Sequence, residues 1–548
     1  MRFDDSQLRE ILLSGGYISE IDAKKADEYS QSHKLSFLEY LKNHGIINSD
    51  LLGQALSEYY GVPYFNLELH QPSDTLMFLV PEGVARKYHI IVIENDDSTV
   101  TVTTDNPKQP EISVVLKKLF PSKKAKLCFS LTEHIVNLLF LYRRPLQERF
   151  DEIVRQGEAV ASNILSEILG DAFMYKTSDI HFEPQETEVL LRFRIDGVLR
   201  EILRIPLNYY ENIVNRIKVA SDLRIDEHST AQDGSVQYHE GDSAVDMRVS
   251  IIPTIHGEKI VFRLLSQYIQ SLHFSDLGFS SEHQEILEAV VKKPFGQILV
   301  TGPTGSGKST TLYSILKYLQ SPEINITTIE DPVEYKIPGV NQTQVNTHTN
   351  MTFANGLRYI VRQDPDIILV GEIRDHETAE IAINAALTGH LLLSTFHANT
   401  GATAIPRLVD MGVEPYLLSS TLELIVAQRL VRKICPQCRV TDSVSVLDLL
   451  KKYPYLKSFL TSKKTLSLFR GKGCVACKGS GYKGRTGVFE MIVLDDDIKS
   501  LILKLPSAKE IWAVARKNGA KSMFEDGLEK IKNGVTTFEE LLRVVEPY

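Results

Sequence analysis

The sequence predicts a multi-domain α/β protein, and three observations support this fold class. The chain has 548 residues, which at roughly 150 residues per domain corresponds to three or four domains. Between about residues 274 and 431, short apolar segments alternate with helical segments, as in a parallel sheet with crossover helices. A glycine-rich loop follows one of these apolar segments directly, at the end of a strand where such sheets bind ligands.

The composition narrows the class of protein further. Apolar residues make up 43% and charged residues 24% of the chain, which excludes collagen and wholesale disorder. The net charge of -9 argues against a generally basic nucleic-acid-binding protein. The chain has no run of about 18 uncharged apolar residues and no apolar leader at its start, so we expect a cytoplasmic protein without a transmembrane segment.

Residues 1–145 are expected to form an N-terminal regulatory or docking domain. Short amphipathic helices come first, and a hairpin and a helix near 111–120 follow. A weak repeat, in which the pattern that starts at residue 12 recurs from residue 41, indicates a duplicated helical unit. Its members are Leu12, Gly16, Ile18 and Ala26 in the first copy and Leu41, Gly45, Ile47 and Ala55 in the second.

Charge, the pattern of apolar residues and the positions of the cysteines divide the rest of the chain into further segments. A charged segment at 146–158 is expected to be a linker. Alternating strands at 178–184, 188–197, 243–251 and 259–265, with helices near 161–174 and 209–220, predict an antiparallel α+β domain over 159–268. The parallel-sheet domain follows over 269–431, then a cysteine-bearing segment at 432–497 and a helical subdomain at 498–548.

The glycine-rich loop fits the phosphate-binding pattern G-x-x-x-x-G-K-[ST]. Its glycines let successive N–H groups turn toward one anion. Lys308 supplies a charge for the β- and γ-phosphates, and the Ser309 hydroxyl can ligate Mg²⁺. The nucleotide-binding residues are therefore predicted to be Gly302, Pro303, Thr304, Gly305, Ser306, Gly307, Lys308, Ser309 and Thr310.

Acidic residues follow two neighbouring apolar segments. Glu372 comes after 367–370, where a phosphate-loop enzyme needs a carboxylate for its metal. A second cluster, from Glu330 to Glu334, holds a carboxylate that can act on water, although an acidic turn begun by Asp-Pro fits equally well. His390 and His397 flank the segment 391–395 and are expected near the terminal phosphate as sensors.

Four of the five cysteines fall in two Cys-x-x-Cys pairs. Two such pairs supply the four thiolates of a closed structural zinc site. The intervening residues, from 438 to 474, exceed the usual spacing and predict an insertion with a helix near 445–457. The predicted zinc ligands are Cys435, Cys438, Cys474 and Cys477, and Cys128 is expected to be a buried apolar residue.

Taken together, these motifs resemble the motor ATPases of type IV pilus assembly and type II secretion, strongly over about 150–548 and more loosely over 1–150. The matching motifs, in order, are GPTGSGKSTTLYS, TIEDPVEY, VRQDPD, ILVGEIRD, TGHLLLSTFHAN, AQRLVRKICPQC and GYKGRTG. The resemblance implies a homohexameric ring whose subunits join a PAS-like domain to a RecA-like domain, with ATP bound between them. It also implies an inner-membrane platform protein as partner and attachment to that membrane through partners.

The resemblance assigns roles to matching residues. Glu372 is the acid that acts through Mg²⁺, Glu334 the carboxylate that acts on water, and His397 the histidine that faces the γ-phosphate. Arg248 and Arg263 are the arginines that the PAS-like domain sends to the phosphates. Relatives often read Arg-Leu-Pro-Gln-Asp-Gly-Arg where this chain has 229–235 without an arginine, which removes positive charge from that segment.

The subtype follows from two features. The four cysteines favour the extension or secretion branch over retraction motors, and the long N-terminal module favours pilus assembly, with type II secretion as the alternative. Cyclic di-GMP binding is not expected, because the repeat starts at 7–9 and 34–36 lack the family's Arg-Leu-Gly pattern. Two further alternatives are a RecA-like DNA motor, which needs a basic surface, and a non-hydrolysing switch, which the two glutamates oppose.

Overall fold

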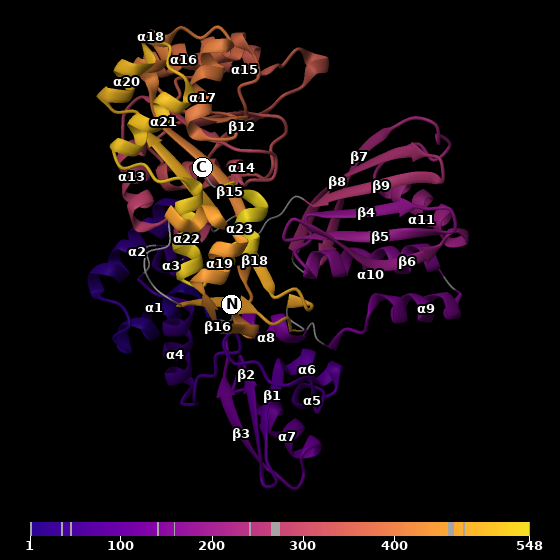
Figure 1. The fold of residues 1–548 in the computed structure, drawn as a ribbon. Helices are drawn as coiled ribbons and strands as arrows, with labels where there is room; N and C mark the ends of the chain where they lie inside the picture. The colour runs from indigo at the N-terminus through magenta and orange to yellow at the C-terminus, as the bar shows by residue number, and fades with distance from the viewer. Residues whose placement is uncertain are drawn as a thin grey trace. The chain divides into compact units, whose positions relative to one another are not determined.

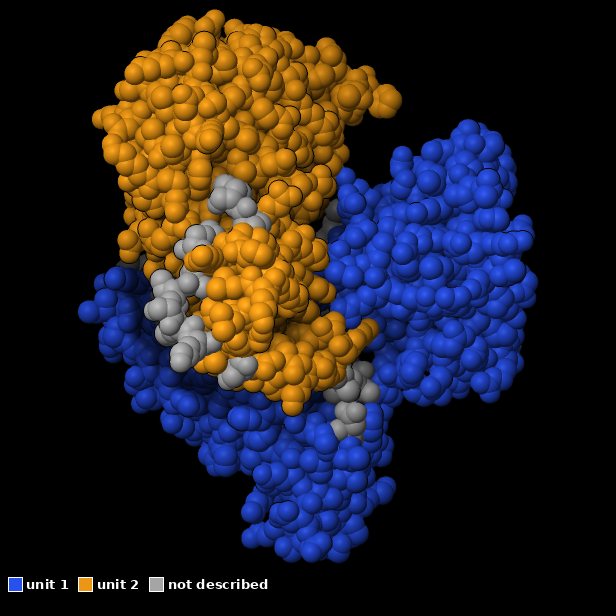
Figure 2. Space-filling model, viewed as in Figure 1, with its two compact units in different colours: residues 1–267 blue, residues 268–548 orange. Residues whose placement is uncertain are grey.

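The computed structural model describes residues 3–33, 37–43, 46–139, 142–157, 159–240, 243–264, 274–458, 465–474 and 477–546. The chain divides into two compact units, residues 1–267 and 268–548 (Figure 2). Unit 1 holds a three-stranded and a six-stranded sheet, and unit 2 a seven-stranded sheet and a two-stranded ladder (Figure 1). The expected boundary between 268 and 269 falls outside the described residues.

Unit 1 begins with a helical module followed by a small α/β module. The helices of the first module are α1 (Asp5–Ser14), α2 (Glu20–His33), α3 (Phe37–Asn43) and α4 (Ser49–Tyr60). In the second, β1 (Ile90–Asn95) and β2 (Thr99–Thr104) form the expected hairpin, and β3 (Lys124–Phe129) pairs with β2 in parallel. Its helices are α5 (Asp74–Met77), α6 (Glu82–Tyr88), α7 (Pro110–Leu119) and α8 (Thr132–Leu139).

The expected repeat contributes one shared core. The apolar members of both copies are buried together, along with Phe129 and Leu131. Gly45 and the second repeat start at 34–36 lie outside the described residues. The buried members are Leu12, Ile18 and Ala26 from the first copy, and Leu41, Ile47 and Ala55 from the second.

The six-stranded sheet of unit 1 is antiparallel and has the order β6-β5-β4-β9-β8-β7 (Figure 1). Alternate residues of its strands are buried with α10 (Val160–Met174) and α11 (Leu207–Ala220), which leaves the other face polar. The strands are β4 (Asp179–Pro184), β5 (Glu188–Ile195), β6 (Val198–Pro206), β7 (Gln232–Glu240), β8 (Ser243–Thr254) and β9 (Gly257–Leu264).

The linker expected at 146–158 is wrong. Residues Leu146–Gln156 form helix α9, whose Leu146 and Phe150 are buried in the core of the six-stranded sheet. These residues lie one helical turn apart and share a face, a spacing that a highly charged sequence disguises. Arg149 of this helix also pairs with the buried Asp171 on α10 at 2.5 Å, so the segment belongs to the domain that follows it.

Unit 2 is built on a sheet with the order β12-β11-β13-β14-β10-β15-β18, parallel except for β18. The parallel sheet with crossover helices expected here is therefore present, and β12, β15 and β18 extend it at its two sides. The strands are β10 (Gly296–Thr301), β11 (Ile326–Glu330), β12 (Asn341–Gln344), β13 (Ile367–Val370), β14 (Leu391–Phe396), β15 (Leu422–Ile434) and β18 (Tyr482–Val493).

Helices cover this sheet and close the chain. Three apolar cores, each of which draws residues from the sheet's strands, hold these helices in place. Those before the cysteine segment are α12 (Phe274–Leu277), α13 (Ser281–Val291), α14 (Lys308–Leu319), α15 (Phe353–Ile360), α16 (His376–Leu387), α17 (Gly401–Asp410) and α18 (Pro415–Thr421). Those after it are α20 (Asp496–Ile502), α21 (Ala508–Lys517), α22 (Met523–Lys532) and α23 (Phe538–Val544). Across the described residues, no helix has both the length and the apolar content needed to cross a bilayer.

Candidate functional site

The phosphate loop joins the fully buried strand β10 to helix α14, as its sequence predicts. Lys308, the first residue of α14, donates from Nζ to the carbonyl oxygens of Gly302 and Pro303 at 3.0 and 3.2 Å. Burial lowers the pKa of Lys308, and the carboxylate of Glu372 opposes that shift. The loop thus holds a cation at a helix N-terminus, where an anionic phosphate is favoured.

Two of the loop's glycines are required by backbone shape and close contacts. Gly302 and Gly307 have φ angles of 149° and 91°, in the region that favours glycine. A Cβ at Gly302 would come within 2.6 Å of the Gln428 carbonyl oxygen and the Ser306 hydroxyl. Backbone conformation therefore requires glycine at both positions, and the close contacts require it again at Gly302.

Gln428 is a residue at the site that the sequence did not single out. It lies on β15, and its side-chain amide donates to the carbonyl of Ser306 at 2.8 Å. Its amide oxygen accepts from the Thr311 hydroxyl of α14 at 2.8 Å. Gln428 therefore fixes the loop and the start of the helix against a neighbouring strand, a role that only the pairing of β15 with β10 could reveal.

Glu372 follows β13 and lies between two basic groups. Arg374 Nη2 donates to Glu372 Oε1 at 2.5 Å, and His397 Nε2 lies 3.2 Å from Glu372 Oε2. The carboxylate raises the pKa of Arg374 through this hydrogen bond. Since the Glu372 side chain is only 12% exposed and its charge also acts on Lys308, it lies at the same sheet edge as the phosphate loop.

The two histidines lie at opposite ends of β14, which corrects the expectation that both lie near the phosphate. His397 follows the carboxyl end, beside Glu372. His390 precedes the strand, and its Nδ1 lies 2.8 Å from the carbonyl oxygen of Ala385. Because six strand residues separate them at about 3.3 Å each, His390 is roughly 20 Å away from the ligand edge.

The acidic cluster at the end of β11 contains two glutamates in different surroundings. Glu330 is buried, accepts from the Thr328 hydroxyl at 2.6 Å, and also accepts from the Tyr313 hydroxyl. Glu334 is exposed on the loop that follows, beyond a cis Asp331–Pro332 bond. Glu330 is therefore held inside the fold, and Glu334 is the carboxylate of this pair that is free to meet a substrate.

Arg248 and Arg263 lie in unit 1, on the polar face of the antiparallel sheet. They are directly opposite each other on β8 and β9. Arg263 is also opposite Asp179 on β4, and its Nε donates to Asp179 Oδ1 at 3.0 Å. Asp179 in turn pairs with Arg194 of β5 at 3.3 Å, so one buried carboxylate orders two arginines of a cross-strand row.

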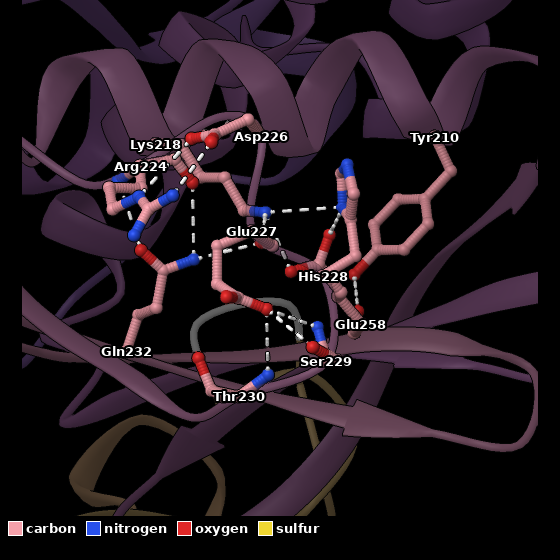
Figure 3. A network of polar contacts seen from close by, with 10 residues as sticks. All are labelled: Tyr210, Lys218, Arg224, Asp226, Glu227, His228, Ser229, Thr230, Gln232 and Glu258. Carbon is pink, nitrogen blue, oxygen red and sulfur yellow. Dashed lines mark hydrogen bonds and ion pairs between the residues drawn. The ribbon is translucent and has the colours of Figure 1, made fainter.

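The loop that departs from the family pattern is fixed by a buried lysine (Figure 3). Lys218 of α11 is 0% exposed, pairs with Glu258 at 2.7 Å and donates to the carbonyl of Glu227 at 2.6 Å. The Ser229 hydroxyl and the backbone N–H groups of Ser229 and Thr230 donate to the Glu227 carboxylate, which brings its pKa down to about 2. The segment is therefore ordered without the arginines that relatives carry.

The four cysteines converge on one point. Their sulfur atoms all lie within 4.8 Å of one another, and neighbouring pairs are 3.7–3.8 Å apart. Four thiolates about 2.3 Å from a tetrahedral zinc ion would lie about 3.8 Å apart, so these residues fit the metal. The set is Cys435, Cys438, Cys474 and Cys477.

Backbone donors favour the anionic form at one of these sulfurs, whereas burial raises the pKa of Cys435 and Cys438. Burial raises the pKa of the Cys477 thiol, but the N–H groups of Cys474 and Gly481, at 3.1 and 3.2 Å, outweigh this and bring it to about 7. Between the cysteine pairs, β16 (Arg439–Ser445) and β17 (Thr465–Gly471) form an antiparallel ladder, and α19 (Val446–Lys452) provides the expected helix. A metal held by four protein ligands would have no open position, which is typical of a structural site. Cys128 is buried, as expected.

The sheet edge as a whole defines a class of protein. A phosphate loop, the carboxylate of Glu372 and the exposed carboxylate of Glu334 all follow the carboxyl ends of strands β10, β13 and β11 in one sheet. Parallel sheets of this kind bind phosphorylated ligands at that edge, and a loop of this pattern is typical of nucleoside triphosphate binding. The fold and site are those of a P-loop ATPase with a RecA-like core.

Comparisons with known proteins identify the family. The family model described as type II/IV secretion system protein matches residues 154–543, and the MshEN domain matches residues 60–145. The chain therefore belongs to the type II/IV secretion system protein family. Its fold is similar to that of the ATPase DotB from Legionella pneumophila, with a TM-score of 0.52 at 20% identity over 69% of this chain and 94% of that one.

Relatives at higher identity carry two kinds of name. The type IV pilus assembly ATPase PilB of Myxococcus xanthus is 35% identical, with 99% of both chains covered. The PilB of Thermus thermophilus is 38% identical over 92% of this chain, which spans only 59% of that protein. The type II secretion system protein E of Pseudomonas aeruginosa is 46% identical over 72% of this chain and 78% of its own length.

Proposed function

We propose that this chain is a Mg²⁺-dependent ATPase that works as a homohexameric motor and powers pilin assembly in type IV pilus extension. The observation that carries the proposal is the convergence of Lys308, Glu372 and Glu334 at one sheet edge of a secretion-family ATPase. Coverage of the full Myxococcus pilus ATPase, including the region of the MshEN domain, favours pilus assembly over the alternative of type II secretion.

In this proposal the residues divide the work. The loop from Gly302 to Thr310 binds the phosphates, and Ser309 and Glu372 would hold Mg²⁺, which would offset the negative charge of the phosphates. Glu334 orients and deprotonates the attacking water. His397, beside Glu372, faces the γ-phosphate. Arg248 and Arg263 would stabilise the charge that develops on the transferred phosphoryl group.

The proposal extends to the assembly. The antiparallel domain of unit 1 acts as the PAS-like lobe, and the RecA-like domain of unit 2 binds ATP through its phosphate loop. An inner-membrane platform protein receives the motion at the cytoplasmic face, and zinc stabilises the cysteine segment. Neither nucleic acid nor cyclic di-GMP is expected as a ligand.

The test is phosphate release by the purified full-length chain with Mg²⁺ and ATP. We expect turnover in the wild type and a loss of at least about 100-fold in Lys308→Ala and in Glu372→Ala, because each removes charge stabilisation from the transition state. Lys317→Ala, on the same helix α14, is the matched control and should keep wild-type turnover. Unchanged turnover in either active-site variant would refute the assignment.

The pathway needs a separate test in the source cell. Disruption of the gene should abolish surface pili and leave protein export unchanged, and the Lys308→Ala gene should fail to restore the pili. Loss of export with normal pili would assign the chain to type II secretion instead.

A further inference from the structure

A buried tyrosine links the helix that begins at the phosphate loop to the loop that carries Glu334. Tyr313 lies on α14, is 1% exposed, and donates its hydroxyl proton to the carboxylate of Glu330. The same hydroxyl oxygen accepts from the backbone N–H of Glu334 at 3.3 Å. One hydroxyl group therefore joins α14, the end of β11 and the loop after β11.

Glu330 anchors this hydroxyl from within the core. Its Oε1 accepts from the Thr328 hydroxyl at 2.6 Å and from the Gln342 amide at 3.2 Å, and its Oε2 accepts from Tyr313. Burial raises the pKa of this carboxyl group, although each of these hydrogen bonds opposes the shift. A carboxylate with donors on both oxygens is fixed in orientation, so the tyrosine hydroxyl is fixed as well.

The remainder of the loop is held from β12. The Gln342 side chain donates to the carbonyl of Tyr335 at 3.1 Å and accepts from the N–H of Ile337 at 2.8 Å. The Tyr335 ring packs edge-on against the Tyr313 ring, with centroids 4.6 Å apart. The backbone on the carboxyl side of Glu334 is thus tied to β12, while the N–H of Glu334 itself is tied to α14.

The geometry of α14 gives this link a functional meaning. Lys308 and Tyr313 are five residues apart on one helix, a rise of about 7.5 Å that a helix holds constant. Phosphates bound at the start of α14 and the backbone of Glu334 would therefore both be held by the same rigid helix. Small errors in the placement of a catalytic group are costly, since about 1 Å can reduce the rate 100-fold.

We propose that Tyr313 is a positioning residue, whose hydroxyl sets the place of Glu334 relative to the phosphates through its bonds to Glu330 and to the Glu334 N–H. The inference rests on the proposed ATPase function. Tyr313 does not touch the nucleotide in this account, so its hydroxyl acts on the catalytic step and leaves nucleotide binding unchanged.

The test is steady-state phosphate release by full-length Tyr313→Phe, which removes only the hydroxyl. We expect kcat to fall by about tenfold or more, while KM for ATP and the affinity for ADP stay within about twofold. Tyr335→Phe is the matched control, because it removes the hydroxyl of a partly buried tyrosine in the same cluster and leaves the hydroxyl of Tyr313 in place. It should keep wild-type kcat and KM.

Two variants of Glu330 test the same link independently, including the case in which Tyr313→Phe does not fold. Glu330→Gln retains an acceptor oxygen for the tyrosine and should keep kcat within about threefold, whereas Glu330→Met removes the acceptor and should lose about tenfold at unchanged KM. A normal kcat in folded Tyr313→Phe or Glu330→Met, a parallel loss of nucleotide affinity, or a large loss in Glu330→Gln would overturn the inference. Absence of turnover in the wild type would instead refute the proposed function.

Discussion

The two large sheets of this chain carry their candidate functional groups in different places. In the parallel sheet of unit 2, the groups sit on loops beyond the strand ends, as Lys308, Glu334 and Glu372 do. In the antiparallel sheet of unit 1, Arg248 and Arg263 sit within strands, on the polar face and in direct cross-strand register. A loop beyond a strand end can move without disturbing the sheet, whereas a residue within a strand is fixed by its neighbours on both sides.

This difference determines what each kind of group can do. The loops of unit 2 can close around a nucleotide, because their backbone is tied to the fold at a few points such as Gln428 and Tyr313. The arginines of unit 1 lie in a cross-strand row in which Asp179 holds Arg263, so their positions are set by the strands on either side. The proposed motor therefore joins an adaptable phosphate site to an inflexible charged surface.

The largest effect that tests this comparison is expected from the arginine row. Arg248→Ala and Arg263→Ala should each lower kcat by about 10²–10³-fold, because an arginine that stabilises the transferred phosphoryl group contributes up to about 10³–10⁵ in related chemistry. Arg248→Lys and Arg263→Lys should also have a low kcat, since lysine lacks the planar fork of donors that arginine has. Phosphate release at saturating ATP measures the effect.

The matched control for the row is Arg204→Ala, which removes an exposed arginine paired with Glu188 and Glu201 on the same sheet. An exposed pair contributes little, so its kcat should stay near the wild type. Normal turnover in Arg248→Ala and Arg263→Ala would show that the row is structural and would end the comparison drawn here.

A smaller effect is expected from the histidines, which test the strand-end rule within unit 2. His397→Ala should lower kcat by about tenfold, because it removes a group that contacts Glu372 at the ligand edge. His390→Ala should change kcat by less than twofold, because it lies at the other end of β14. Equal losses in both variants would contradict the assignment of the two ends.

Features defined by residues that are close together in the chain could be predicted from the sequence, whereas contacts between distant residues could not. The phosphate loop, Glu372 and the cysteine pairs were predictable because each is defined by residues close together in the chain. The cross-strand contact of Arg263 with Asp179 was not, since it joins residues 84 positions apart. Helix α9 was missed because its charges hide two apolar positions, and Gln428 because its role depends on which strand lies beside β10.

The smallest effect on turnover is expected from the zinc ligands, and it separates stability from chemistry. Metal analysis should find about one zinc ion per chain, and Cys474→Ser should lose it, whereas Cys128→Ser should retain it. Removal of a structural metal lowers folding stability directly. A loss of only a few kcal/mol, at about 2–4 °C per kcal/mol, would lower the Tm of unit 2 by about 10 °C.

Turnover at a temperature below that transition should change by less than about threefold in Cys474→Ser. The reason is distance along β15: Gln428 contacts the phosphate loop, and Cys435 follows seven residues later, roughly 23 Å along an extended strand. A zinc-free wild type that is fully folded would refute the metal site. A zinc-dependent kcat in a stably folded chain would show instead that β15 transmits changes at the cysteines to the phosphate loop. In that case the groups that adjust the phosphate site would include residues within a strand as well as residues on loops.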